Sequence, residues 1–518
     1  CMQITTFAGV DIGSYEVGMK IFELSSKYGM REITYVRHRI DLGRDAYTTG
    51  RISTEVMDEL CVILTDFMHI MKEYQVQAYR ACVTSAIRES DNALIVLDHI
   101  KVRSGMTVEA LSNSEQRFLG YKSIAYQGKS FEKMIQKGTA IFDVGGGSIQ
   151  LSLFDKDRLV TTENIRMGII RIRERLQGLE DRPSYMVPLI EELVNSEIGA
   201  FRRMYVKDRE IRSVILIGDY INYVVRRYRK KPEGDTPFVT KEELMADMEQ
   251  LSALSPAQIA KRLEIPAENE SMILPALVVY RKLLKDTPAE LIWAPGLNLS
   301  DGLAYDYAEQ HKIIRGSHNF ENDILAAAKN IAKRYQADRP HVAHVADLAL
   351  TIFDAMRKPA GLKDRDRLLL NISVQLHHCG KFITISKAPE CNYNIIMSTE
   401  IIGLSHKERN LVANIVRYVI TDFAGFDELA AKEDIEEESY LKIAKLVAIL
   451  RVANALDRSH KQKIREMKAS LKGSQLVLTV DTDEDMTLER GLFPDKAEFF
   501  EEVFGIRPEI RMKKRLNG

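Results

Sequence analysis

A glycine-rich segment at residues 139–154 carries residue types that could hold phosphate and a metal ion. An apolar run ends at Asp143, and the residues shortly after it are Gly145, Gly146, Gly147 and Ser148. Apolar and polar residues then alternate up to Phe154, so the pattern predicts a strand, a glycine turn and a second strand. Glycine has no Cβ, and its N–H groups can therefore approach an anion closely. The adjacent Asp143 carboxylate is a candidate ligand for a divalent ion.

The element after the glycines decides which kind of phosphate loop is present. A Walker loop or a dinucleotide-binding fingerprint needs its glycine turn to open a helix, whereas a strand is predicted here. Ser148 and Gln150 are two residues apart on that strand and therefore share its polar face. An ordinary glycine-rich hairpin without a ligand is the alternative interpretation.

A shorter copy of the same plan stands near the N-terminus. There an apolar run leads to Asp11, Gly13 and Ser14, and apolar residues then recur at every second position. Two copies indicate a duplicated domain. If the copies face each other, Asp11 and Asp143 flank one cleft as metal ligands, with a phosphate loop on each side. This arrangement resembles the actin-like and sugar-kinase-like ATPase superfamily, which handles phosphoryl groups by positioning and metal charge.

Between these segments, a strand predicted at residues 79–84 ends in small hydroxylated residues followed by Arg88. A guanidinium at a strand end can bind phosphate through paired hydrogen bonds, so Arg88 is a candidate phosphate ligand; a surface ion pair is the alternative. Further along, Ser112 and Glu115 have the spacing of a capping box at the start of a predicted helix. Glu115 therefore has a structural role available besides a catalytic one.

Taken in order, several motifs resemble those of the exopolyphosphatase/guanosine pentaphosphate phosphohydrolase (Ppx/GppA) family. They lie at residues 10–14, 84–88, 111–115, 143–148, 273–277, 302–303, 450–460 and 499–505. The resemblance covers nearly the whole chain. It implies duplicated actin-like, RNase H-like lobes, a divalent metal (usually Mg²⁺), and release of a terminal phosphate from linear polyphosphate or from pppGpp. It also implies a glutamate near the cleft, since the attacking water needs a base within hydrogen-bond reach.

The chain departs from the family pattern where that glutamate is expected. The family's Ser-Gly-x-Glu-Glu-Ala corresponds to residues 112–117, which places the catalytic position on Gln116 and its neighbour on Glu115. Gln150 likewise stands where the family usually has Glu. An amide can orient water but cannot take its proton at ordinary pH.

Two hypotheses follow. The preferred one is a Mg²⁺-dependent hydrolase that uses Glu115 or a base elsewhere. The other is a homologue that binds polyphosphate or a nucleotide alarmone with little or no turnover. An ATP-dependent kinase of the same superfamily is a weaker third hypothesis, because no adenosine loop is recognisable.

Two features of the second lobe bear on ligand binding. A buried strand at residues 214–217 leads to Gly218 and then to bulky side chains through residue 222, where the family has a Gly/Thr-rich loop. This difference argues against ligand contact at that loop. A concentration of basic residues between residues 202 and 231, which includes the basic segment 226–231, is interpreted as a solvated helix face, with a track for a polyanion as the alternative.

Residues 311–460 show helical periodicity and resemble the HD-type helical domain that accompanies long members of the family. Functional HD sites hold metal with His, a His-Asp pair and a distant Asp, but here the pair reads His377-His378 and the expected downstream His-His pair is missing. A vestigial helical domain is the preferred interpretation. A metal site formed by His341, His377, His378 and Asp457 is the alternative, since imidazole suits several transition metals.

The last segment, residues 461–518, contains a predicted strand at 476–480 and a helix near 496–503, which indicates a small α+β appendage. The predicted fold is therefore α/β. It has duplicated ATPase-like lobes at residues 1–125 and 126–310, an all-α HD-like domain at 311–460, and the appendage. The appendage is a candidate lid or dimer contact, so a homodimer is one expectation.

Composition limits the classes of function. At 518 residues the chain is too long for one core, and 45% hydrophobic with 28% charged residues is typical of a globular protein. With 73 basic and 74 acidic residues, no global field recruits nucleic acid or a membrane. No apolar run approaches the roughly 20 residues of a membrane span, and no secretion signal is recognised, so a cytoplasmic location is expected. Five scattered cysteines predict neither a disulfide nor a zinc framework.

Overall fold

The computed structural model describes residues 4–126, 129–177, 183–226, 238–316 and 318–513. The chain divides into two compact units, residues 1–320 and residues 321–518. Each is described by itself. The basic segment predicted at residues 226–231 lies, apart from Arg226, outside the described residues.

The first sheet of the N-terminal unit begins with the predicted hairpin. In spatial order its strands are β3 (Gly29–Arg39), β2 (Glu16–Ser25), β1 (Thr5–Ile12), β4 (Ala78–Val83) and β5 (Val108–Ala110). Neighbours from β3 to β1 are antiparallel, and β1, β4 and β5 are parallel. Because β1 and β2 pair up to the contact between Ile12 and Val17, the predicted turn at Gly13 is confirmed.

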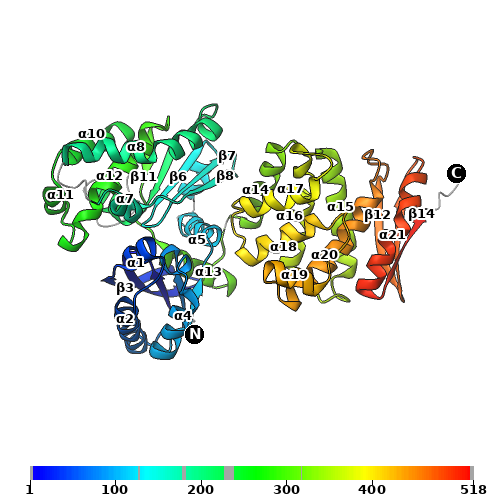
Figure 1. Ribbon diagram of the computed structural model, residues 1–518, viewed down its shortest axis with the longest axis horizontal. Helices are drawn as coiled ribbons and strands as arrows, with labels where there is room; N and C mark the ends of the chain where they lie inside the picture. Colours follow the sequence, from blue (N-terminus) through cyan, green and yellow to red (C-terminus); the bar gives the residue numbers. More distant parts are fainter. Residues whose placement is uncertain (1–3, 127–128, 178–182, 227–237, 317, 514–518) are drawn as a thin grey trace. The chain divides into compact units, whose positions relative to one another are not determined.

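The second sheet repeats this plan. Its strands are, in spatial order, β8 (Arg158–Ile165), β7 (Ile149–Asp155), β6 (Thr139–Val144), β9 (Ser213–Ile217), β11 (Leu291–Trp293) and β10 (Val239–Thr240). Again the first neighbours are antiparallel, and β6, β9 and β11 are parallel. The shared order confirms the predicted duplication, and Figure 1 shows the two sheets in separate lobes of this unit.

Helices cover both faces of the first sheet. On one face α2 (Thr54–Glu73) and α4 (Ala93–Ser104) close a core with alternate residues of β1. On the other face Phe7 of β1 contacts a cluster that includes Leu119 of α5 (Asn113–Ala125) and Leu303 of α13 (Leu299–Gln310). Helix α13 packs on the first sheet.

The core of the second lobe lies between its sheet and α12 (Glu270–Lys285) with α8 (Pro183–Phe201). The other helices of the N-terminal unit are α1 (Leu42–Thr49), α3 (Ser85–Arg88), α6 (Lys129–Ile135), α7 (Ile169–Arg175), η1 (Arg202–Val206), α9 (Asp219–Val225), α10 (Lys241–Ser252), α11 (Pro256–Leu263) and η3 (Ala267–Asn269). Helix α5 also reaches this lobe, because Tyr121 contacts Phe154 of β7 edge to face.

The C-terminal unit starts with helices, as predicted. They are α14 (Phe320–Arg334), α15 (Arg339–Met356), α16 (Asp364–Leu376), η4 (Cys379–Phe382), α17 (Ala388–Ser398), α18 (His406–Arg417), α19 (Phe426–Glu433) and α20 (Glu437–Leu456). Helix α20 is buried along most of its length, and α15 and α18 pack against it. A helix that is apolar on most sides is typical of a central position in a helical core.

The end of the chain forms a small sheet with one covering helix. Its strands are β12 (Glu466–Lys472), β13 (Gln475–Asp481) and β14 (Arg507–Met512), and α21 (Thr487–Phe504) connects the parallel strands β13 and β14. The strand predicted at residues 476–480 is confirmed. The helix predicted near residues 496–503 begins earlier, at Thr487, and it continues through Pro494.

No helix in the described ranges is both long and apolar enough to cross a membrane. The predicted domain boundaries at residues 125, 310 and 460 stay predictions.

Candidate active site

Loops from both lobes line one cleft of about 130 Å³ in the N-terminal unit. Asp11 lies near the end of β1, and Asp143 lies near the end of β6. The predicted site residues that line this cleft are Asp11, Gly13, Ser14, Gln116, Asp143, Gly145, Gly146, Gly147 and Ser148. The two aspartate-bearing hairpins therefore face a common space.

The glycine loops touch each other, and the contact requires glycine. A Cβ on Gly146 would lie 2.9 Å from Cβ of Ser14, and a Cβ on Gly147 would lie 2.1 Å from the Tyr47 hydroxyl. These hydroxyls form a network, with Ser14 Oγ 2.8 Å from the Tyr47 oxygen and that oxygen 2.5 Å from Ser85 Oγ. Hydroxyl groups thus gather where the two loops meet, and hydroxyls can donate hydrogen bonds to an anion.

Asp11, Asp143 and Asp219 place their charges close together. Burial first, then the charges of Asp219 and Asp143, raise the pKa of Asp11 to about 7. Burial and Asp219 raise the pKa of Asp143 to about 7, against the lowering effect of Arg117. Oδ1 of Asp11 is buried and has no hydrogen-bond partner among the described residues. Carboxylates that raise one another's pKa are suited to sharing a cation, which would remove the repulsion.

Asp219 was missed by the sequence analysis, which expected bulky side chains to keep ligands away from residues 218–222. Gly218 and Asp219 nevertheless both line the cleft. Gly218 has φ of +140°, and helix α9 begins directly after it. Helical geometry then points successive side chains in different directions, so Tyr220 and Ile221 enter the core while Tyr15 donates a hydrogen bond to Asp219 Oδ2 at 2.8 Å.

The sequence signal that could have identified Asp219 is its position just after the strand β9. β9 runs parallel to β6, and Ile217 pairs with Asp143. The carboxyl ends of adjacent parallel strands meet at one edge of a sheet, and ligands bind there in open α/β sheets.

Glu16 is a second residue that the sequence analysis missed. It stands two residues after Ser14, opens β2 and lines the cleft. Burial and the charge of Asp219 raise the pKa of Glu16 to about 8, while Arg37 lowers it; Nε of Arg37 lies 3.9 Å from Glu16 Oε1. In the register of the two hairpins Glu16 corresponds to Ser148, because the Gly13 N–H donates to the Glu16 carbonyl as the Gly145 N–H donates to the Ser148 carbonyl.

Glu115 and Gln116, the two neighbouring residues considered for the catalytic base, lie in the first turn of α5 but have different surroundings. Glu115 forms a capping box with Ser112, in which the Ser112 N–H donates to Glu115 Oε1 at 3.2 Å. Glu115 is not among the residues that line the cleft, whereas Gln116 is. Arg88 is also outside the lining; it donates to the Leu111 carbonyl and, at 2.6 Å, to Asn113 Oδ1. Arg88 thereby anchors the start of α5.

Gln150 is buried on β7, opposite Asp143, and is not among the residues that line the cleft. Its Oε1 has no hydrogen-bond partner within the described part of the chain, and neither do the nitrogens of the buried Arg117. The Arg117 charge nevertheless acts on Asp143. Arg117 follows Gln116 directly, so α5 brings an amide and a guanidinium to this side of the site.

Fold and site together define a class of protein: duplicated α/β lobes with a carboxylate-lined cleft between glycine loops. The chain belongs to the Ppx/GppA phosphatase family, whose family model matches residues 21–311. The model of Ppx/GppA phosphatase, domain III, matches residues 325–495. These matches confirm the resemblance inferred from the motifs, and they support a phosphohydrolase activity.

Curated relatives share low identity over nearly the full length. The protein named guanosine-5'-triphosphate,3'-diphosphate pyrophosphatase from Photobacterium profundum is 20% identical over 495 residues, 92% of this chain and 91% of that protein. A protein of the same name from Aeromonas hydrophila is 21% identical over 496 residues, 94% of this chain and 92% of that protein.

Solved structures share the fold of about 60% of this chain. The Ppx/GppA family member of Aquifex aeolicus has a TM-score of 0.50 at 19% identity and covers 60% of this chain and 99% of its own. An exopolyphosphatase from Cytophaga hutchinsonii has a TM-score of 0.50 at 19% identity and covers 59% of this chain and 98% of its own. The predicted α/β fold class with duplicated actin-like lobes is confirmed.

Proposed function

We propose that this protein hydrolyses a terminal phosphoanhydride bond of inorganic polyphosphate or of a pppGpp-like nucleotide, in the cleft between the lobes. The observation that carries the proposal is the meeting of Asp11, Asp143 and Asp219 with two glycine loops in one cleft. The names of the relatives support this substrate class, because one is a pppGpp-type pyrophosphatase and one an exopolyphosphatase.

The carboxylates fit Mg²⁺. This ion prefers oxygen ligands and binds through one or two carboxylates together with substrate phosphates, and Asp11 Oδ1 is a buried acceptor without a partner among the described residues. Asp143 and Asp11 would hold the ion, with Asp219 as a further acceptor. When bound, Mg²⁺ neutralises charge on the phosphate oxygens and on the leaving group.

The residues of the loops would bind and orient the substrate. Backbone N–H groups of Gly146 and Gly147, with the hydroxyls of Ser14 and Ser148, can donate to phosphate oxygens. The N–H groups of Gly13 and Gly145 instead close their own turns by donating to the Glu16 and Ser148 carbonyls. Donors that are already positioned cost no reorganisation when charge develops. Arg88 donates its hydrogen bonds at the start of α5 and is therefore not used as a phosphate ligand in this proposal. Arg171 donates to the Gly147 carbonyl at 2.6 Å and so stabilises the glycine loop.

Glu16 is the proposed general base. Gln116 and Gln150 cannot accept a proton, and Glu115 caps α5. Glu16 lines the cleft and has a pKa of about 8, close to the operating pH that favours proton transfer. In this role Glu16 would accept the proton of the attacking water.

The test is phosphate release from purified protein, measured with long-chain polyphosphate and with pppGpp, in Mg²⁺ and in chelator. A binding titration with each substrate runs beside it. Mg²⁺-dependent release is expected. Tight binding without release in any condition would refute the hydrolase and favour the second candidate, a binding homologue, for which the amides Gln116 and Gln150 are the supporting observation.

Restoring a carboxylate at residue 116 is expected to raise turnover. In Gln116→Glu the new carboxylate faces the cleft and adds a second base, so kcat should rise about tenfold or more, the lower part of the range for general-base catalysis. Affinity should stay within a few-fold. Glu115→Gln is the matched control, because it changes the cap only; its kcat should stay near the wild-type value. An unchanged or lower kcat in Gln116→Glu would show that the water does not lie beside residue 116.

Asp11 and Asp143 should each contribute a stability term that depends on pH in the metal-free protein. Their pKa is raised from an ordinary 3.8 to about 7 in the folded protein. Between about pH 4 and 7 these two groups bind more protons in the folded state than in the unfolded chain, so their contribution to stability falls as pH rises through this window. Mg²⁺ binds the deprotonated form and should therefore raise Tm at pH 8 by at least about 2 °C, with little effect at pH 5.

Thermal melts in chelator and in Mg²⁺ at both pH values check this. A double variant, Asp11→Asn with Asp143→Asn, should lose this contribution to the pH dependence and the Mg²⁺ effect, whereas Glu16, whose pKa is also raised, keeps its own contribution. An equal Mg²⁺ effect at both pH values would contradict the assignment of these carboxylates as ligands.

A further inference from the structure

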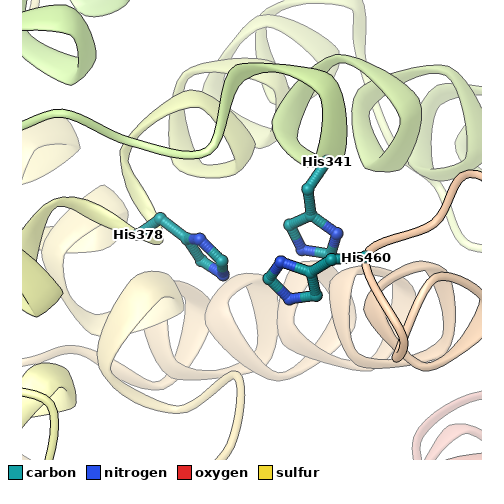
Figure 2. Close-up of side chains that lie close together, drawn as sticks. All are labelled: His341, His378 and His460. Carbon is teal, nitrogen blue, oxygen red and sulfur yellow. The ribbon is translucent and has the colours of Figure 1, made fainter.

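Histidines from three parts of the C-terminal unit meet outside the cleft described above. His341 lies in the first turn of α15, His378 follows α16, and His460 lies in the turn after α20. Figure 2 shows the His378 ring directed toward the rings of His341 and His460. One nitrogen from each ring lies within 4.8 Å of the others.

The backbone around His460 is shaped to bring its ring to this place. His460 has φ of +55°, a left-handed conformation that a side chain disfavours, and its N–H donates to the Asp457 carbonyl at 2.9 Å. Its ring then stacks on that of His341, with centroids 3.6 Å apart and planes 3° from parallel. The His378 and His341 centroids are 4.8 Å apart.

Carboxylates hold two of the rings from behind. Nδ1 of His341 lies 2.7 Å from Asp457 Oδ2, and Nδ1 of His460 lies 2.7 Å from Asp338 Oδ2. A carboxylate on one ring nitrogen fixes the ring and leaves the other nitrogen as the ligand, the usual arrangement behind metal-binding histidines. Nε2 of His341 lies 3.1 Å from Asn454 Oδ1, a hydrogen bond that a bound ion would replace.

The charged groups around the cluster suit a cation. Asp457 and Asp338 lie against His341 and His460, and Asp338 also offsets the positive charge of Lys381.

We propose that His341, His378 and His460 bind one transition-metal ion of the Zn²⁺ class. Three histidines with a fourth position left for water or a ligand are a known coordination pattern for Zn²⁺. This set differs from the alternative drawn from the sequence. Asp457 lies behind His341 instead of binding the ion, and His377, whose Nδ1 is 2.5 Å from the Val374 carbonyl oxygen, is not one of the three histidines that form the cluster. The site is independent of the proposed hydrolase activity.

The experiment uses the full chain without an affinity tag that contains histidine. Metal content is measured after purification without chelator, Zn²⁺ affinity is measured by competition with a chromophoric chelator, and Co²⁺ is added to follow its ligand-field absorption. About one Zn²⁺ per chain is expected, with a visible Co²⁺ spectrum of tetrahedral type. Asp143→Asn should keep this Zn²⁺, which separates the site from the interlobe cleft.

His378→Ala and His460→Gln should weaken Zn²⁺ binding by at least about 100-fold, and Asp338→Asn by about 10-fold, as for residues that orient a ligand. His406→Ala, which removes an exposed histidine of the same unit, is the matched control and should bind as the wild type does. The His460 side chain is 27% exposed, so His460→Gln should fold even if a substitution in the core of the cluster does not; circular dichroism checks this. Substoichiometric Zn²⁺ at micromolar concentration, or equal affinity in His460→Gln and His406→Ala, would overturn the proposal.

Discussion

Asp143→Asn is expected to lower the rate of phosphate release by at least about 1,000-fold, because a bound metal ion contributes several kcal/mol to charge stabilisation and each 1.36 kcal/mol is tenfold in rate. The substitution keeps the shape of the side chain, so the hairpin of β6 and β7 should persist. Mg²⁺ affinity, measured by calorimetry, should fall together with the rate. Asp219→Asn should show the same pattern more weakly.

Asp155→Asn is the matched control, since it removes a carboxylate at the far end of β7 in the same hairpin; rate and affinity should stay near wild type. The double variant, Asp143→Asn with Asp219→Asn, should lose little more than the more damaged single variant, because both carboxylates act on one ion and their effects are not independent. If Asp143→Asn kept Mg²⁺ affinity and rate within about threefold of wild type, the proposed metal site would be wrong.

Glu16→Gln is expected to lower kcat by about 100- to 10,000-fold, the range typical of a positioned general base. The pH profile distinguishes this role from a structural one. Glu16 has a pKa of about 8 in the metal-free protein, and only its deprotonated form accepts a proton. Bound Mg²⁺ would offset the Asp219 charge that contributes to this pKa. The wild-type kcat/KM in Mg²⁺ should therefore rise with pH and level off below pH 8, and Glu16→Gln should remove that rise.

Glu23→Gln, farther along β2, serves as the control for loss of a carboxylate from this strand. Mg²⁺ affinity should change at most a few-fold in Glu16→Gln, since Asp11 and Asp143 remain. A large loss of Mg²⁺ affinity with the pH rise intact would instead make Glu16 a metal ligand, and the general base would have to be sought elsewhere.

The two hairpins show which parts of the site can be predicted from local sequence patterns. Asp11 and Asp143 were predicted as partners because each ends an apolar strand before a glycine turn, and both the turn and the strand alternation depend on residues close in sequence. The duplication followed from comparing the two segments, and the sheet order confirms it. From the sequence, Arg88 could be placed only near the end of a strand. Its role at the start of α5 depends on hydrogen bonds to Leu111 and Asn113, which are distant from it in the sequence.

The sequence by itself determined the family, the repeated glycine hairpins and the pair of aspartates, because these depend on local periodicity and on motif order. Only the tertiary structure decided that Asp219 joins them, that Glu16 faces the cleft while Glu115 caps a helix, and that His460 meets His341 and His378. Each of these depends on the direction in which one side chain leaves its strand, helix or turn. That direction is set by packing between segments far apart in the chain, as between Tyr15 and Asp219, and residue spacing does not encode it.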